Sequence, residues 1–301
     1  MFSKHRRWAA VAGPVALAAG LSLAPLGVSQ ARVTQPGTAR AAAAPQAAAR
    51  AAAHARALPV ITVKMNGKTI SVTGALRSGG ARIAFRVTGE AAALPIFVRL
   101  DPGVTLARFF AVLPSAAADP NNLYGIAQIS MSTQANKGSS SVQANMAPGR
   151  YVALDLGPST PVPPFTTFVI TRSKSPARLP APGATISTID FGFRGAAKVR
   201  DGELVRFANQ GFLVHMVFGV QAPNLKTAQK IARLLLAGRD NQAQKLAIGS
   251  YTFDNGLSHG ESFQAVIGVR PGFWVIACFF DTQDHREHTT RGMERVIQIV
   301  G

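Results

Sequence analysis

The sequence is poor in cysteine, acidic residues and histidine, and the first two shortages exclude particular classes of protein. One cysteine among 301 residues excludes an intramolecular disulfide and any zinc motif built on cysteine pairs. Only 14 acidic residues accompany 32 basic ones, which leaves a formal net charge of +18. The basic residues form neither a run nor a stripe interleaved with aromatics, so the charge indicates a diffuse positive field rather than a nucleic-acid-binding surface. Such a field favours an acidic protein or lipid headgroups as a partner, in a salt-dependent way.

The N-terminal segment has the composition of an export signal. Basic residues near the start precede an apolar run from Trp8 to Val28, and residues 29–31 place small side chains where a signal peptidase cleaves. We predict a signal peptide over 1–31, with an uncleaved membrane anchor as the alternative because the run approaches a bilayer-spanning length. No later stretch is apolar enough to span a membrane. The mature protein is therefore expected outside the cytoplasm, secreted or associated with the cell envelope.

Residues 32–58 are dominated by alanine and also contain arginine, Pro36 and Pro45. Alanine favours helix, but there is no apolar stripe to bury and the prolines interrupt the run. We predict a disordered Ala/Pro/Arg-rich linker, with a short transient helix over 46–57 as the alternative. His54 lies in this segment and is expected to be solvated.

Beyond the linker, short segments alternate apolar and polar residues between turns rich in Gly, Pro and Asn. This period-two pattern predicts the strands of a β-sandwich. Each half also contains one stretch with helical spacing. The first is expected over 104–113, stopped by Pro114. The second is expected over 225–237, with Asn224 as N-cap and Gly238 as C-cap.

The two halves of this region align in order, which indicates an internal repeat. Residues 81–100 correspond to 202–220, and the predicted helices follow in both halves. The Pro-Gly segment at 148–152 then corresponds to the one at 271–275. The nearly constant spacing between equivalent segments would rarely arise by chance among β-rich sequences.

The repeat predicts where the domains begin and end. We expect one sandwich domain over 59–172 and a second over 184–301, joined by a linker at 173–183 that is rich in Pro, Ser and Ala. Both domains would have a normal size for a unit with its own core.

Two segments of the second half resemble the metal-binding strands of the cupredoxin family. Asn209-Gln-Gly-Phe212 precedes His215 as Asn-x-Gly-Phe precedes the first copper histidine of cupredoxins, and Pro271-Gly-Phe-Trp-Val-Ile-Ala-Cys278 resembles their Pro-Gly-x-Tyr-x-x-x-Cys strand. The resemblance covers 184–301. It implies an all-β fold of two tandem cupredoxin-like Greek-key β-sandwiches, each with one inserted short helix, and the first sandwich would be a degenerate, ligand-free repeat.

The resemblance also implies one type 1 copper ion per chain, held by His215, Cys278, His288 and Met293. His288 and Met293 keep the His-x4-Met spacing of plastocyanin-like proteins. Two imidazoles, a thiolate and a weak axial thioether are the ligands of such a site, and the soft ligands disfavour a hard metal. Cys278 and His288 are farther apart than in small plastocyanins. His285 is therefore the alternative to His288, although only His288 keeps the spacing to Met293.

Each of these ligands also has an ordinary structural interpretation. A lone buried cysteine is usually an inert small hydrophobe, a histidine on an apolar strand is often a hydrogen-bonded core residue, and a methionine often only packs. The order of the four ligand types and their flanking motifs favours copper. His259 follows Gly-Leu-Ser and is interpreted as a turn residue. No histidine lies between His54 and His215, so the first half cannot form a type 1 site.

The predicted function is that of an exported mononuclear type 1 copper protein that transfers single electrons by Cu(I)/Cu(II) cycling. Its partner would be a redox protein, with an acidic surface if the positive field guides docking, and no nucleic acid. The alternative is a copper-handling or a metal-free cupredoxin-like binding or structural module. Serine-hydrolase, zinc-protease, phosphate-loop and dinucleotide motifs are all missing. We therefore expect an electron-transfer or binding protein rather than an enzyme.

Overall fold

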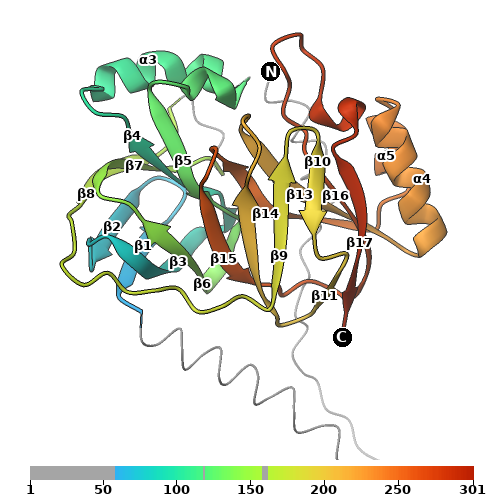
Figure 1. Ribbon diagram of the computed structural model, residues 1–301, viewed down its shortest axis with the longest axis horizontal. Coiled ribbons are helices and arrows are strands. Elements are labelled where there is room, and N and C mark those ends of the chain that lie inside the picture. The colour runs from blue at the N-terminus through green and yellow to red at the C-terminus, as the bar shows by residue number, and fades with distance from the viewer. Residues whose placement is uncertain (1–57, 118, 158–161) are drawn as a thin grey trace, which may run out of the picture.

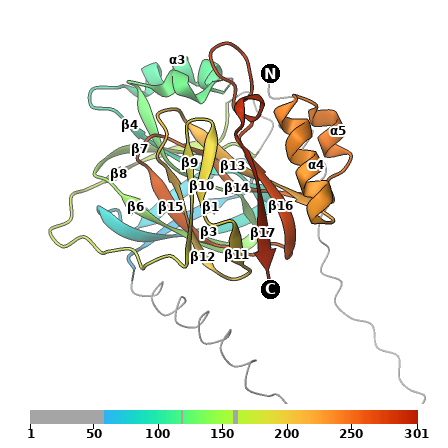
Figure 2. The same ribbon diagram turned by 45° about the vertical axis from the view of Figure 1, so that its right-hand side comes forward.

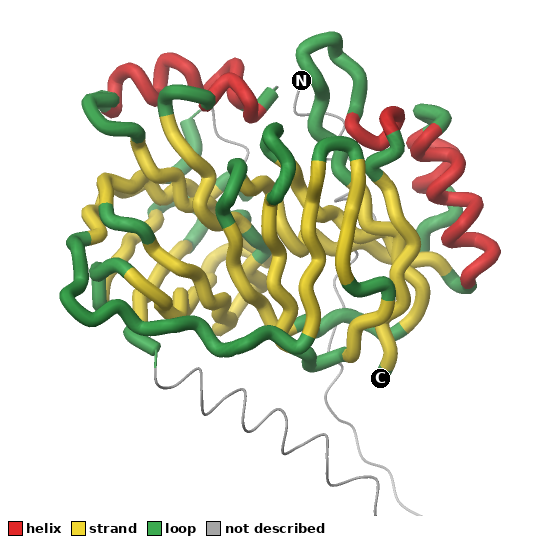
Figure 3. Tube along the Cα trace, in the orientation of Figure 1, coloured by secondary structure: helices red, strands yellow, loops and turns green. Residues whose placement is uncertain are grey.

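Strands dominate the computed structural model, which describes residues 58–117, 119–157 and 162–301 (Figure 1). The predicted signal peptide lies outside these residues, and so does the predicted linker apart from Leu58. Helices lie at the edges of a body built from strands (Figure 3). None of the helices in the described ranges is long and apolar enough to cross a membrane. The mostly β architecture predicted from the alternating pattern is confirmed.

The described residues of the first half form eight strands, one α-helix and one 3-10 helix. The alternation seen in the sequence corresponds to alternating burial: β1 buries Ile61, Val63 and Met65 and turns the residues between them outward. The elements are β1 (Val60–Met65), β2 (Ile70–Gly74), β3 (Gly79–Ala93), β4 (Pro95–Leu100), α3 (Leu106–Ala116), η1 (Pro120–Leu123), β5 (Ala127–Ser132), β6 (Ala135–Met146), β7 (Gly149–Asp155) and β8 (Phe165–Ile170).

The second half contains nine strands. Its helices are inserted after its fifth strand, whereas α3 follows the fourth strand of the first half. The elements are β9 (Ala184–Ile189), β10 (Gly192–Gly195), β11 (Lys198–Arg200), β12 (Leu204–Asn209), β13 (His215–Ala222), α4 (Leu225–Leu236), α5 (Asp240–Gln244), β14 (Gly249–Leu257), β15 (Ser262–Val266), β16 (Gly272–Ala277), η2 (His288–Arg291) and β17 (Glu294–Val300).

Three sheets are formed, and the largest of them runs through both halves. The eight-stranded sheet has the order β10-β9-β12-β15-β6-β3-β1-β2, the five-stranded sheet β11-β17-β16-β13-β14, and the four-stranded sheet β5-β4-β7-β8. The halves join where β15 pairs with β6, with Phe263 opposite Ala144 and Ala265 opposite Val142. One hydrophobic cluster likewise contains core residues of both halves, among them Phe85 and Phe207. The division into two separate domains stays a prediction.

The two predicted helices form, with one difference. Asn224 caps α4 as predicted, since its side chain accepts the Thr227 N–H over 2.9 Å, and Gly238 follows the helix in a left-handed conformation. The prediction that Pro114 stops the first helix was wrong, because α3 continues through it to Ala116. Proline removes only one backbone donor there, close to the helix end, and the Ala117 N–H still bonds to the Leu113 carbonyl.

The five-stranded sheet is covered on its outer face by α4 and α5, as both views show (Figures 1 and 2). Ala228, Ile231 and Leu235 of α4 are completely buried against it. The two helices exclude solvent from the outer side of β13 and β16. The two strands that carry candidate ligands are therefore enclosed by protein on both faces.

Candidate metal centre

Three buried side chains meet where β13 begins and β16 ends. His215 is the first residue of β13, and Cys278 directly follows the last residue of β16. These strands are antiparallel neighbours, so the start of one lies beside the end of the other. His288 is the first residue of η2, on the loop that follows β16. All three side chains are completely buried.

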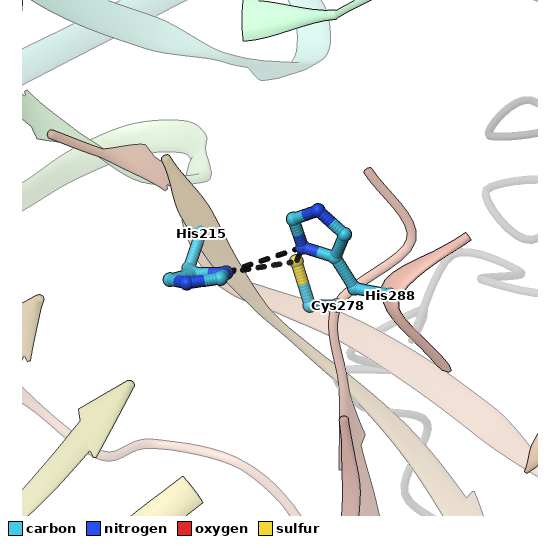
Figure 4. Close-up of side chains that lie close together, drawn as sticks. All are labelled: His215, Cys278 and His288. Carbon is cyan, nitrogen blue, oxygen red and sulfur yellow. Dashed lines mark hydrogen bonds between the residues drawn. The ribbon is translucent and has the colours of Figure 1, made fainter. Parts of the chain in front are cut away.

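The potential ligand atoms of these side chains face one another (Figure 4). The Nδ1 atoms of His215 and His288 are 3.2 Å apart, and Cys278 Sγ lies 3.3 Å from His288 Nδ1 and 3.9 Å from His215 Nδ1. No other group of three or more His, Cys, Asp or Glu residues converges in this way in the part of the chain that the structure describes. We call this group the His–Cys–His site.

The separations suit a first-row transition metal at the centre of the triangle. Bonds of about 2.0 Å to nitrogen and about 2.3 Å to sulfur, in a trigonal plane, place the ligand atoms roughly 3.5–3.8 Å apart. The observed separations of 3.2, 3.3 and 3.9 Å lie on either side of that range. The residues therefore fit a metal ion with two nitrogen ligands and one sulfur ligand.

The loop after β16 explains why His288, and not His285, reaches the site. Asp281 and Glu287 form an isolated antiparallel bridge, so the residues between them leave the strand end and return. The His288 N–H then donates to the Phe280 carbonyl over 2.9 Å. His285 is exposed on the excursion, with a left-handed φ of 60°, and does not belong to the site.

Met293 is held next to the site by the backbone. Its carbonyl accepts the Cys278 N–H over 3.2 Å, and its own N–H donates to the His288 carbonyl over 3.0 Å. The side chain is completely buried, in the same hydrophobic cluster as Cys278 and Phe279. Its role as an axial ligand stays a prediction.

Burial determines the protonation of the site in the absence of a metal. It raises the pKa of the Cys278 thiol to about 12. Burial, together with the neighbouring His215, lowers the pKa of His288 to about 4, and burial also lowers the pKa of His215. At neutral pH the site therefore consists of a neutral thiol and two neutral imidazoles. A metal ion that binds the sulfur must displace the thiol proton.

The approach to His215 is fixed by the asparagine of the family-like motif. Asn209 Nδ2 donates to the carbonyls of Leu213 and Leu257 over 2.7 and 2.8 Å, and its Oδ1 accepts the Gly211 N–H over 2.8 Å. These bonds tie the loop before β13 to β14. His259 lies in the turn after β14, as predicted, with its Nδ1 2.8 Å from the Gly211 carbonyl.

The sequence analysis missed Asp190, which lies between β9 and β10. Its Oδ1 is 3.0 Å from His215 Nε2. Burial raises the pKa of Asp190, but hydrogen bonds from the N–H groups of Leu213 and Phe212 and from His215 outweigh burial and lower it, so the group is ionised at neutral pH. No ligand motif surrounds this residue. The one available signal is an acidic residue in a short turn between two strands.

Comparison with solved structures finds copper proteins. Auracyanin A, a "blue" copper protein from Chloroflexus aurantiacus, is 13% identical with a TM-score of 0.24, and the match covers 38% of this chain and 95% of that one. The copper nitrite reductase of Nitrosomonas europaea is 9% identical with a TM-score of 0.23, covering 80% and 94%. A multicopper oxidase is 14% identical with a TM-score of 0.22, covering 80% and 87%. No family model matches the sequence, and no curated protein matches it either.

These comparisons correct one prediction. The chain was expected not to be an enzyme, yet the nitrite reductase and the multicopper oxidase, which match over 80% of it, are enzymes by name. The exclusion of catalysis was therefore wrong, and a catalytic role is compatible with the matches. At these identities and TM-scores the likeness assigns no activity, so the function is argued from the site.

Proposed function

We propose that the His–Cys–His site binds one copper ion as a type 1 centre, with Met293 as the axial ligand, and that the protein transfers single electrons through it. The observation that carries the proposal is the convergence of two imidazole Nδ1 atoms and one thiol within 4.8 Å, all buried. One sulfur and two nitrogen ligands disfavour magnesium and calcium, which prefer oxygen.

When bound, copper would supply a one-electron couple between Cu(I) and Cu(II). The chain's own contribution is to hold the ligands still and keep water away. Cys278 Sγ accepts the Met216 N–H over 3.4 Å, and Asp190 holds the far side of the His215 ring. Ligands fixed by such bonds have little room to rearrange when the charge of the metal changes.

The test is reconstitution of the full-length chain with one equivalent of Cu(II). We expect an intense visible thiolate-to-copper absorption, which the variant C278S loses. Copper binding without that absorption supports the copper-handling alternative, and no binding supports a metal-free module. Reconstitution with Co(II) is the matched control for a preformed site, because cobalt reports the same thiolate ligand without redox chemistry.

The location and partner belong to the same proposal. We propose that residues 1–31 direct export and are cleaved, which N-terminal sequencing of protein recovered from outside the cytoplasm would test. Residues 59–183 hold 12 basic and 4 acidic residues, which favours an acidic redox partner. Electron transfer to such a partner should slow as ionic strength rises.

A further inference from the structure

The turn between β9 and β10 contacts both imidazoles of the His–Cys–His site, although it lies far from them in the sequence. Asp190 bonds to His215, with 3.0 Å between Oδ1 and Nε2. The ring of the next residue, Phe191, meets the ring of His288 edge-to-face, with their centroids 5.4 Å apart. One two-residue turn therefore lies behind both nitrogen ligands of the proposed centre.

The Asp190 carboxylate is itself held in place by the backbone. Oδ1 accepts the Leu213 N–H over 3.1 Å, in addition to its contact with His215, and Oδ2 accepts the Phe212 N–H over 3.1 Å. Both donors belong to the loop that leads into β13. The carboxylate thus bridges this loop and the imidazole, and it cannot rotate away without losing all three bonds.

The hydrogen bond between Asp190 and His215 determines which ring nitrogen of His215 carries the proton. Both carboxylate oxygens of Asp190 already accept backbone N–H groups, so Oδ1 acts as an acceptor toward the ring and His215 donates from Nε2. Its Nδ1 then keeps a free lone pair, and this is the atom that faces Cys278 and His288. Asp190 therefore selects the tautomer in which His215 can bind a metal through Nδ1.

The packing around the bond leaves no space for a side chain at Gly211. A Cβ there would lie 2.6 Å from Asp190 Oδ1 and 2.8 Å from His215 Nε2, both closer than real Cβ contacts. Glycine at this position lets the carboxylate reach the ring. The backbone of Phe191 is also unusual, with a left-handed φ of 60° that is strained in a residue other than glycine. Its ring packs between His288 and the Arg291 guanidinium.

We propose that Asp190 is the positioning residue of the metal centre, which fixes His215 as an Nδ1 ligand and adds a negative charge that favours the more oxidised metal. The inference rests on the proposed function in so far as it concerns a bound metal. The charge is next to the ring but partly in water: the Asp190 side chain is 40% exposed, whereas that of His215 is 0% exposed. Such outer contacts orient a ligand histidine and raise its basicity.

The experiment compares D190A and D190N in the full-length chain with D201N. Asp201 is exposed, in the turn where its N–H bonds to the Val300 carbonyl, so D201N removes one charge without touching the site. The first measurement uses the metal-free protein, in which ring nitrogen NMR shifts report the tautomer of His215. We expect the Nε2–H form in the wild type and in D201N, and a mixture of tautomers in D190A.

The variant D190N separates the positioning of the His215 ring from the negative charge of Asp190. Its amide oxygen can still accept from His215, so we expect the tautomer to be kept, while the amide nitrogen opposes the Phe212 N–H and loses that bond. Co(II) affinity should fall about 10- to 100-fold in D190A and less in D190N. The reduction potential of the copper form should rise in both variants, because both lack the negative charge, and stay unchanged in D201N.

The outcomes separate this inference from the proposed function. If D190A keeps the wild-type tautomer of His215, the wild-type Co(II) affinity and the wild-type reduction potential, the positioning role is overturned even if copper binds. If the wild-type chain binds no copper, the proposed function fails, while the tautomer measurement on metal-free protein still decides whether Asp190 positions His215. Circular dichroism of D190A verifies folding. If D190A fails to fold, D190N decides: an unchanged Co(II) affinity would overturn the positioning role, and an unchanged reduction potential would overturn the charge effect.

Discussion

Asp155, at the end of β7, and Cys278, directly after β16, align in the predicted sequence repeat and carry different polar side chains. Asp155 ends β7 and is completely buried, and its Oδ1 accepts the N–H groups of Leu94 and Gly157, both over 3.0 Å. Cys278, the residue aligned with Asp155, is equally buried but faces two imidazoles. In the first half, the Asp155 side chain therefore satisfies backbone N–H groups on both sides of the strand end.

In the second half, other groups hydrogen-bond to the backbone around the equivalent position. The Cys278 N–H bonds to the Met293 carbonyl, and Asn209 ties the loop before β13. Cys278 Sγ also accepts the Met216 N–H and Asp190 holds His215 Nε2, while Sγ and the two imidazole Nδ1 atoms face one another. A buried polar group in this framework is a candidate ligand when other groups already satisfy the surrounding backbone.

The largest expected effect comes from changing the two matching residues themselves. C278S should abolish the thiolate-to-copper absorption and lower Co(II) affinity by more than about 100-fold, because it removes the only soft ligand of the His–Cys–His site. D155A should leave the absorption unchanged and destabilise folding by about 1–3 kcal/mol, because the hydrogen bonds from the Leu94 and Gly157 N–H groups are both lost. Absorption titrations and urea unfolding measure the two effects. Loss of copper binding in D155A would contradict the division between the halves.

The next effect separates two histidines of one loop. H288A should lose the type 1 absorption, since it removes a nitrogen ligand, whereas H285A should keep it because His285 is exposed on the excursion. The visible spectrum of each copper-loaded variant decides between them. An H285A variant without the absorption would mean that the loop closes differently once the metal is bound.

A smaller effect concerns Glu90, which lies beside Asp155 in the half without ligands. Burial, then the charge of Asp155, raises the pKa of Glu90 to about 7. The folded chain thus holds a proton that the unfolded chain releases above its ordinary pKa near 4.5. Protonated Glu90 therefore contributes to the free energy of unfolding. This contribution is complete below pH 4.5 and is lost as pH rises through about 7. E90Q should therefore show a smaller drop in unfolding free energy between pH 5 and pH 8 than the wild type.

The control for Glu90 is D101N, which removes an acid of the same half outside the Glu90–Asp155 pair. Urea unfolding at both pH values gives the comparison. Asp254 and Glu294 also have raised pKa values, of about 8 and about 7, so part of the pH dependence will persist in E90Q. An E90Q variant with the full wild-type dependence would contradict the raised pKa of Glu90.

The smallest effect is expected from Met293. If it is a weak axial ligand, M293L should retain the copper and the blue absorption but raise the reduction potential, because losing the thioether favours Cu(I). Electrochemistry of the two copper-loaded proteins measures the shift. An unchanged potential would mean that Met293 only packs in its hydrophobic cluster.

Much of this comparison could be predicted from the sequence, because it depends on local patterns. Alternation predicted the strands, and motif order together with spacing predicted that His215, Cys278 and His288 converge. Asp190 was missed because its importance arises only where the turn after β9 meets the loop before β13. The continuous eight-stranded sheet was missed for a similar reason: the pairing of β6 with β15 leaves no periodic signal in either segment.

The sheet shared by the two halves links the stability of the first half to metal binding in the second. Because β6 hydrogen-bonds to β15, the first half cannot move away from the second without breaking the pairing of these two strands. Free energy added by a bound ion therefore also opposes those openings of the first half that separate β6 from β15. Amide hydrogens and protease-sensitive bonds of the first half would report whether the second is loaded. Protection in the first half thereby becomes a measure of metal occupancy at the His–Cys–His site of the second.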